Sequence, residues 1–238
     1  MNTKLRLYFS DKIQSDLVAH LKKEQSHYLK DVMRLKIGDS FSVFNGQGEW
    51  NASIESYEKE GARIKILHKL RDKENEQNIW LAFTPIKQNP LNFIIQKATE
   101  LGVQKFIPIL SERTMVKDIN IERVKKIIVE SAEQSNRISI PEINNLESLK
   151  KFLSDFPKNG CLVFCDINCN KSDLKNILSK KDLGPICILI GPEGDFISEE
   201  IELALSCDFK TISLGKNRLR TETAGIAACH ILNIINEK

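Results

Sequence analysis

Two loops in the C-terminal half hold the residue types best suited to ligand chemistry. The first, Gly191-Pro192-Glu193-Gly194, directly follows an apolar run that ends at Ile190, and we call it the glycine loop. Glycines on both sides of a proline make a stiff turn that a ligand can approach closely, because no Cβ intervenes. An ordinary turn from a strand into a helix fits the same four residues. The tetrapeptide alone therefore leaves both interpretations open.

Acidic residues in and after the glycine loop restrict the ligand that it could hold. A phosphate-binding loop combines backbone amides with a Lys followed by Ser or Thr, whereas this loop carries Glu193 and is followed by Asp195. Carboxylates would repel the phosphates of a nucleotide, but they are compatible with the sulfonium and amino groups of S-adenosylmethionine. The Gly-x-Gly-x-x-Gly pattern of dinucleotide-binding folds is also missing, since no helix follows Gly46 and Gly48.

The second loop runs from Leu214 to Ala224, from a strand into the last helix, and we call its part Leu214–Arg220 the basic loop. It carries Lys216, Arg218 and Arg220 just before a segment with helical spacing. Free amide groups at a helix N-terminus favour anions, so these cations could hold an RNA phosphate there. Thr221 is expected to cap the helix. A capped helix with solvated basic residues is the simpler alternative.

The elements before residue 79 predict a small β-rich domain. Short alternating runs such as Arg63–Leu67 indicate strands, Asn45-Gly46 is a strong hairpin-turn dipeptide, and residues 25–34 can form a helix. A small barrel or sandwich over residues 1–70 follows from this pattern. Residues 71–78 are polar and charged, so they are expected to form a linker to a second domain, residues 79–238.

From residue 79 onward, apolar strands alternate with amphipathic helices. This order predicts an α/β domain with a parallel sheet covered on both faces, in which ligands bind beyond the carboxyl ends of the strands. The expected strands are 79–83, 106–110, 162–164, 186–190 and 211–214, and the expected helices are 91–101, 120–137, 171–180, 199–206 and 223–235.

Composition excludes several classes of protein. No apolar run approaches the ~20 residues that span a membrane, and the N-terminus lacks a secretory signal, so we expect a cytoplasmic protein without a membrane partner. The net charge is +3, and residues 1–70 hold the excess, with 12 Lys and Arg against 9 Asp and Glu. Cys161, Cys165 and Cys169 do not have the spacing of a metal site, so we expect free thiols and no metal.

These motifs together resemble the knotted SPOUT methyltransferases. The resemblance is specifically to the RsmE-type family, which methylates N3 of a uridine in 16S ribosomal RNA. It is carried by Ile190–Gly194, by Leu214-Gly215 and by Leu219–Ala224. Further matching residues are Lys97–Val103, Pro108, Ser111–Arg113, Glu133–Ser135, Arg137, Arg6, His27, Arg34, Gly38 and Asp39.

The resemblance implies a PUA-like β-barrel that helps to hold RNA, followed by a parallel-sheet domain with a C-terminal trefoil knot. It also implies S-adenosylmethionine bound in the knot, 16S rRNA of the small ribosomal subunit as partner, and a homodimer. The implied cofactor-binding residues are Leu189, Ile190, Gly191, Pro192, Glu193, Gly194, Leu214, Gly215, Leu219, Arg220 and Thr221. The implied RNA-binding or substrate-binding residues are Arg6, His27, Arg34, Arg113, Glu133, Gln134, Arg137 and Arg218.

Uridine N3 carries a proton and is a poor nucleophile until that proton leaves. An arginine aimed at the flanking carbonyl oxygens would stabilise negative charge, and a carboxylate could accept the proton. We nominate Arg220 for the first role and Glu222 for the second. Two departures from the family pattern are Asp195, where a third glycine is usual, and Asn217-Arg218, where Arg-Ile is usual.

Two other functions fit parts of the pattern. A non-catalytic RNA-binding or ribosome-assembly protein could keep the same fold without turnover. A hydrolase or ligase that holds phosphate in the glycine loop conflicts with the acids there and with the missing Lys-Ser/Thr.

The last predicted helix bears on oligomeric state. From Ala224 to Ile235 the strongly polar side chains are His230 and Asn233, so the helix is apolar nearly all round and must be covered on every side. One sheet face covers about half of a helix, so the remainder needs either more of the same chain or a second subunit. A two-fold contact is the commonest solution for a soluble homo-oligomer.

Overall fold

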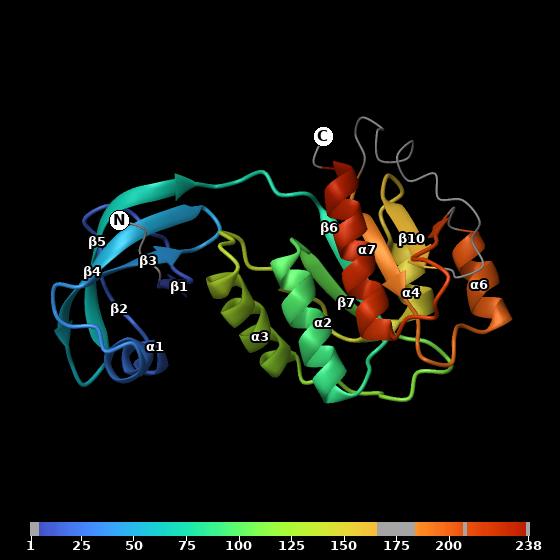
Figure 1. Ribbon diagram of the computed structural model, residues 1–238, viewed down its shortest axis with the longest axis horizontal. Helices are drawn as coiled ribbons and strands as arrows, with labels where there is room; N and C mark the ends of the chain where they lie inside the picture. Colours follow the sequence, from blue (N-terminus) through green and yellow to red (C-terminus); the bar gives the residue numbers. More distant parts are fainter. Residues whose placement is uncertain (1–4, 166–183, 207–208, 237–238) are drawn as a thin grey trace. The chain divides into compact units, whose positions relative to one another are not determined.

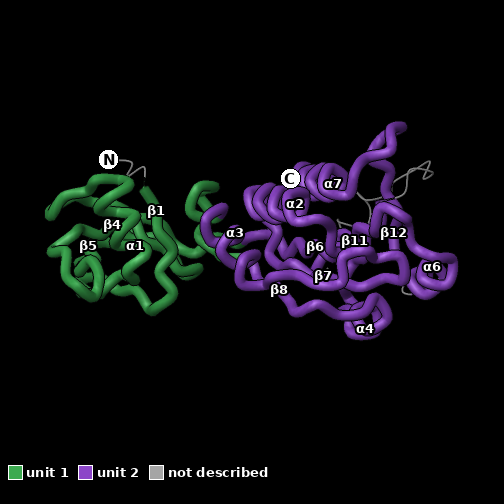
Figure 2. The backbone as a smooth tube through the Cα atoms, turned by 90° about the horizontal axis from the view of Figure 1, so that it is seen from below, with its two compact units in different colours: residues 1–75, 132–140 green, residues 76–131, 141–238 purple. Residues whose placement is uncertain are grey.

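The computed structural model describes residues 5–165, 184–206 and 209–236. The chain divides into two compact units, Met1–Asn75 with Ala132–Ile140, and Glu76–Ser131 with Pro141–Lys238 (Figure 2). The division adds residues 132–140 to the N-terminal unit, which the expected boundaries at 70 and 79 did not include. The polar segment from residue 71 is also shorter than expected, because a strand continues to Asp72.

The N-terminal unit is built on a five-stranded sheet with the order β1-β3-β4-β5-β2. Strand β1 pairs with β3 in parallel, and the other neighbours are antiparallel. The strands are β1 (Arg6–Tyr8), β2 (Val18–His20), β3 (Ser40–Phe44), β4 (Gly48–Tyr57) and β5 (Ala62–Asp72). The Asn45-Gly46 turn joins β3 to β4, which confirms the predicted hairpin.

Alternation along the strands produces the core of this unit. In β5 the side chains of Ala62, Ile64 and Ile66 are fully buried, while the residues between them reach solvent. The helix expected over residues 25–34 begins two residues earlier and is irregular: it consists of α1 (Lys23–His27) and the π-helical turn η1 (Tyr28–Val32).

The C-terminal unit is built on a sheet with the order β12-β10-β11-β6-β7-β8, and β9 also pairs with β7. Every pair in it is parallel, which confirms the predicted sheet class. The strands are β6 (Ile79–Phe83), β7 (Lys105–Leu110), β8 (Glu142–Ile143), β9 (Glu147–Ser148), β10 (Cys161–Cys165), β11 (Ile186–Ile190) and β12 (Lys210–Ile212).

Helices cover both faces of this sheet, as predicted. Helices α2 and α7 lie side by side on one face, and α4 lies on the other (Figures 1 and 2). Helices α4 and α6 pack on Ala82, Leu162 and Leu189, which point to the same face. The helices of this unit are α2 (Gln88–Glu100), α4 (Leu149–Asp155), α6 (Ser198–Leu205) and α7 (Thr221–Asn236), and α3 (Ile121–Gln134) begins in it and ends in the N-terminal unit.

Three expectations for this unit involve residues outside the described ranges. The helix expected over residues 171–180 and Cys169 lie outside the described residues, and the path of a trefoil knot also depends on residues 166–183. No helix in the described ranges is both long and apolar enough to cross a membrane.

Candidate functional site

A cleft of about 510 Å³ opens at the carboxyl ends of β10 and β11, within the size range of small-molecule and cofactor sites. The glycine loop follows β11 on one side, and the basic loop leads into α7 on the other. This is the position at which parallel α/β sheets bind ligands. The cleft is lined by Pro90, Phe164, Cys165, Leu189, Ile190, Gly191, Pro192, Glu193, Asp195, Phe196, Arg218, Leu219, Arg220, Thr221, Glu222 and Ala224.

Most of the sequence-predicted cofactor residues line this cleft together. Gly194, Leu214 and Gly215 were also expected there, but they are not among the lining residues. Lining residues that the sequence did not predict include Phe164 and Cys165. The parallel pairing of β10 with β11 places the ends of both strands at one edge, so this adjacency is the signal that could have identified them.

The buried ring of Phe196 packs against Gly191 at the start of the glycine loop. A Cβ added at Gly191 would lie 2.8 Å from Cε2 of the Phe196 ring. Phe196 is buried, packs against Phe164 with 5.7 Å between ring centroids, and lines the cleft. Gly191 is therefore needed because an aromatic ring packs against it. The sequence interpretation, in which its Cβ would enter the ligand's space, did not include this neighbour, and Gly191 also lines the cleft.

Arg113 braces the other end of the glycine loop. Its Nη1 donates to the carbonyl oxygen of Gly194 at 2.8 Å. The neighbouring backbone amide of Glu112 donates to Oε1 of Glu200 at 2.8 Å, which ties this segment to α6. Arg113 was expected in the substrate pocket, but it does not line the cleft.

Arg220 and Glu222 both line the cleft at the start of α7. Among the described residues, no hydrogen bond or ion pair holds either side chain, so both are available to a ligand. Thr221 is the first residue of α7 and is buried. The expected cap position therefore belongs to Arg220, whose carbonyl oxygen accepts from the Ala224 amide at 2.8 Å.

The cysteine at the cleft is not a nucleophile. Burial raises the pKa of the Cys165 thiol to about 12, so it is protonated at neutral pH, and a thiol reacts as its thiolate. Cys187 and Cys229 are fully buried, and burial likewise raises the pKa of each thiol. A search of the described ranges finds no group of three His, Cys, Asp or Glu side chains that could hold a metal ion.

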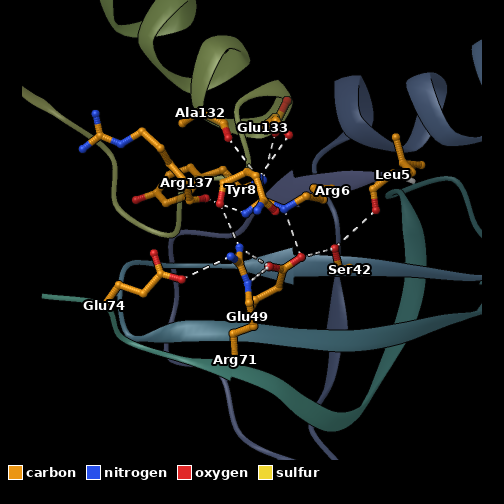
Figure 3. Close-up of polar contacts among 11 residues, drawn as sticks. Leu5, Arg6, Tyr8, Ser42, Glu49, Arg71, Glu74, Ala132, Glu133 and Arg137 are labelled. Carbon is orange, nitrogen blue, oxygen red and sulfur yellow. Dashed lines mark hydrogen bonds and ion pairs between the residues drawn. The ribbon is translucent and has the colours of Figure 1, made fainter. Parts of the chain in front are cut away.

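Arg6, expected to contact RNA, is instead buried in the N-terminal unit (Figure 3). Its side chain is 8% exposed and its Nε donates to Glu49 at 2.9 Å. Its two terminal nitrogens donate to the carbonyl oxygens of Ala132, Glu133 and Arg137. The guanidinium thus holds the carboxyl end of α3 and the turn after it, which corrects the expected RNA contact.

Glu49 is the centre of this buried cluster. Arg71 donates to its Oε2 at 2.6 Å and Ser42 donates to its Oε1 at 2.6 Å (Figure 3). Burial acts to raise the pKa of Glu49, but the Ser42 hydroxyl and the two guanidinium groups outweigh burial and hold the pKa below its usual value. Glu49 therefore remains charged and compensates Arg6 and Arg71.

The other candidate RNA residues of the N-terminal unit divide by exposure. Arg137 is buried, and Glu133 accepts a hydrogen bond from the Tyr8 amide at 2.8 Å, so both contribute to packing. Gln134, His27 and Arg34 are exposed. These three side chains remain accessible to a partner.

Comparisons with known proteins agree with this arrangement. A family model described as an RNA methyltransferase domain matches residues 73–233, and one described as an RNA methyltransferase PUA domain matches residues 21–67. A ribosomal RNA small subunit methyltransferase E from Rickettsia conorii is 34% identical, over 94% of this chain and 92% of the relative. The chain belongs to the ribosomal RNA small subunit methyltransferase E family. A Bacillus subtilis member is 30% identical, over 90% of this chain and 89% of its own.

Solved structures of similar proteins support the same fold class. A ribosomal RNA small subunit methyltransferase E from Neisseria gonorrhoeae, bound to S-adenosyl methionine, is 27% identical, with a TM-score of 0.87 and 97% of each chain covered. A protein from Legionella pneumophila in complex with the bound cofactor SAM is 30% identical, with a TM-score of 0.87 and 98% of each chain covered. The predicted α/β domain with a parallel sheet, preceded by a PUA-like domain, is confirmed.

Proposed function

We propose that this protein transfers a methyl group from S-adenosylmethionine to N3 of a uridine in 16S rRNA of the small ribosomal subunit. The observation that carries the proposal is the cleft, in which Arg220 and Glu222 stand beside the glycine loop at the carboxyl edge of the parallel sheet. Members of the family are named for methylation of small-subunit ribosomal RNA, and two similar structures contain the cofactor.

The cleft has the chemistry that S-adenosylmethionine needs. Glu193 suits its sulfonium and amino groups, while Phe164, Leu189 and Leu219 offer apolar surface to its adenosine. When bound, the cofactor supplies an activated methyl group. We assign cofactor binding to the glycine loop and to Leu189, Ile190, Leu219, Arg220 and Thr221.

The remaining chemistry falls to two side chains of this chain. Arg220 stabilises negative charge on the uridine carbonyl oxygens that flank N3, and Glu222 accepts the N3 proton. The two side chains stand two residues apart at the start of α7. Because no bond to the base itself is made by the protein, rate enhancement depends on orienting the base and excluding water.

RNA binding is assigned to the exposed candidates. They are His27, Arg34 and Gln134 in the N-terminal unit and Arg218 in the C-terminal unit. The N-terminal unit, residues 1–75 with 132–140, is proposed as the RNA-holding domain, and residues 76–131 with 141–238 are proposed as the methyltransferase domain. Arg6, Glu133 and Arg137 serve packing, so we no longer assign them to RNA.

The proposal includes three properties of the whole protein. It acts in the cytoplasm, it works as a homodimer, and it needs no metal. The homodimer is supported by the partly exposed apolar side of α7, on which Ile234 is 53% exposed.

Two experiments test the function. Mapping of modified bases in 16S rRNA should show one uridine that loses its N3 methyl group in cells lacking the protein and regains it on complementation. Calorimetric titration should show binding of S-adenosylmethionine and none of ATP. A complete modification pattern without the protein, or preferential ATP binding, would contradict the proposal. Cofactor binding with no missing methyl group would favour the alternative, a non-catalytic RNA-binding protein.

A further inference from the structure

An ion pair joins the two loops that border the cleft. Nη2 of Arg218 donates to Oδ2 of Asp195 at 2.7 Å. Asp195 directly follows the glycine loop after β11, whereas Arg218 lies in the basic loop before α7, and both residues line the cleft. The pair therefore connects one wall of the cleft to the other.

The backbone presents the Asp195 carboxylate from a fixed turn. Asp195 has a φ of 58°, in the left-handed region that aspartate tolerates better than most residues. Its amide donates to the carbonyl oxygen of Pro192 at 3.0 Å and closes the turn that contains the glycine loop. The position of the carboxylate is thus coupled to the conformation of the glycine loop.

We propose that the Asp195–Arg218 ion pair retains the cofactor, by fastening the glycine loop to the basic loop across the cleft so that cofactor release is slowed. This inference rests on the proposed function, which places S-adenosylmethionine in the cleft. Neither residue is needed for the chemical step, so both act as positioning residues.

The pair should be stronger with the cleft filled than with it empty. Its side chains are 73% and 74% exposed without a ligand, and water screens such exposed pairs so that they contribute little. A bound cofactor displaces water from the inner side of the pair and lowers the local dielectric constant, which strengthens the attraction. The ion pair therefore stabilises mainly the cofactor-bound state. It lowers the dissociation rate of the cofactor more than it changes the association rate.

The test measures the dissociation rate of S-adenosylmethionine after rapid mixing with excess S-adenosylhomocysteine. Asp195→Asn keeps the shape of the side chain and its tolerance of the left-handed region, and Arg218→Gln removes the opposite charge. We expect each change to speed release about two- to fivefold, the upper part of the range measured for exposed ion pairs. The double variant should release cofactor no faster than the faster single variant, because both changes remove the same interaction.

Three further variants separate the ion pair from a general structural effect. Arg218→Lys should retain most of the slow release, because it keeps the positive charge. Asp195→Gly should release the cofactor faster, although glycine adopts the left-handed backbone conformation at this position without strain. Glu122→Gln removes another exposed ion pair, with Lys125 at 2.7 Å on α3, and should leave release unchanged. Added salt should speed release from the wild-type protein and have a smaller effect on the double variant.

The outcomes distinguish this inference from the proposed function. Unchanged release in Asp195→Asn and Arg218→Gln, or fully additive effects in the double variant, would overturn the retaining role and leave the cofactor assignment intact. Failure of the wild-type protein to bind S-adenosylmethionine would overturn both.

Discussion

At the scale of single residues, the cleft separates groups that face the ligand from groups that shape its walls. Arg220 and Glu222 have no side-chain partner among the described residues and line the cleft. Arg113 and Phe196 instead hold the glycine loop, through the Gly194 carbonyl and against Gly191. Substitutions in the two groups should therefore affect different steps, catalysis in the first and cofactor binding in the second.

Arg220→Ala should lower methyl transfer by roughly a hundredfold or more, the scale of losing one preorganised charge-stabilising group, and change cofactor affinity only a few-fold. The matched control is Lys216→Ala in the same basic loop, because Lys216 is exposed and does not line the cleft. Single-turnover methylation of an RNA substrate, together with calorimetry, measures both quantities. Near-normal turnover in Arg220→Ala would remove this residue from the mechanism.

Gly191 and Gly194 offer a matched pair within the glycine loop. A Cβ at Gly191 would meet Phe196 at 2.8 Å, whereas one at Gly194 would make an ordinary contact with Arg113 at 3.5 Å. Gly191→Ala should cost roughly 1–3 kcal/mol of stability through overpacking and weaken cofactor binding about tenfold by displacing a ring that lines the cleft. Gly194→Ala should change neither quantity appreciably. Equal affinities for the two variants, by calorimetry, would refute this role of Phe196.

At the scale of elements, strands and helices with a long periodic pattern could be predicted from the sequence. Short elements, and contacts between residues far apart in the chain, could not. Side-chain alternation predicted β5, and helical spacing predicted α2 and α7, because each repeats a pattern over many residues. The seven-residue helix α4 is too short to show a period. The place of residues 132–140 in the N-terminal unit depends on hydrogen bonds from Arg6 across more than a hundred positions, which no local pattern records.

For the candidate site, the sequence identified both loops that border the cleft, and also Arg220 and Glu222, which line it. It could not distinguish an exposed arginine from a buried one, since Arg6 and Arg34 differ only in their neighbours. Burial of Arg6 follows from Glu49, which lies 43 positions away. The contact between Asp195 and Arg218, at a separation of 23 positions, was likewise beyond any local pattern.

The buried cluster predicts how the carboxyl end of α3 is held to the sheet of the N-terminal unit. Glu49→Gln should lower the stability of that unit by roughly 3 kcal/mol at neutral pH, because Arg6 and Arg71 would lose their buried counter-charge. Chemical denaturation followed by Trp50 fluorescence measures the loss. Glu60→Gln is a suitable control, since Glu60 is exposed at the turn between β4 and β5.

The same cluster predicts a pH dependence. The pKa of Glu49 is held below the usual 4.5 in the folded protein, so its contribution to stability is complete above that value and is lost as the pH falls through the lowered pKa. Between pH 5 and pH 3, approximately, the stability of the wild-type unit should fall more steeply than that of Glu49→Gln. Parallel curves would show that the carboxylate does not stabilise the fold.

At the scale of the whole molecule, α7 connects the cleft to a surface that this single chain leaves partly uncovered. One side of α7 packs on α2, where the Asn233 side chain donates to the carbonyl oxygen of Leu101. On another side His230 is exposed and Ile234 is 53% exposed, while Ile226 lies between buried and exposed. These three residues repeat every four positions and so form one row along the helix.

This row predicts that the protein pairs through α7. A partly apolar helix face beside the cofactor cleft favours a two-fold contact, the commonest arrangement in soluble homo-oligomers. Ile234→Glu should place a charge in that contact and shift the protein to monomers, while the fold is retained because the position is half exposed. Ala228 is fully buried within the chain, so a charge there would test folding instead of pairing.

Val32→Glu is the control, because Val32 is similarly exposed, at 57%, in the N-terminal unit. Sedimentation equilibrium at micromolar concentration should show a dimer for the wild type and for Val32→Glu, and a monomer for Ile234→Glu. A monomeric wild type would refute the pairing, and a dimeric Ile234→Glu variant would move the contact away from this face of α7.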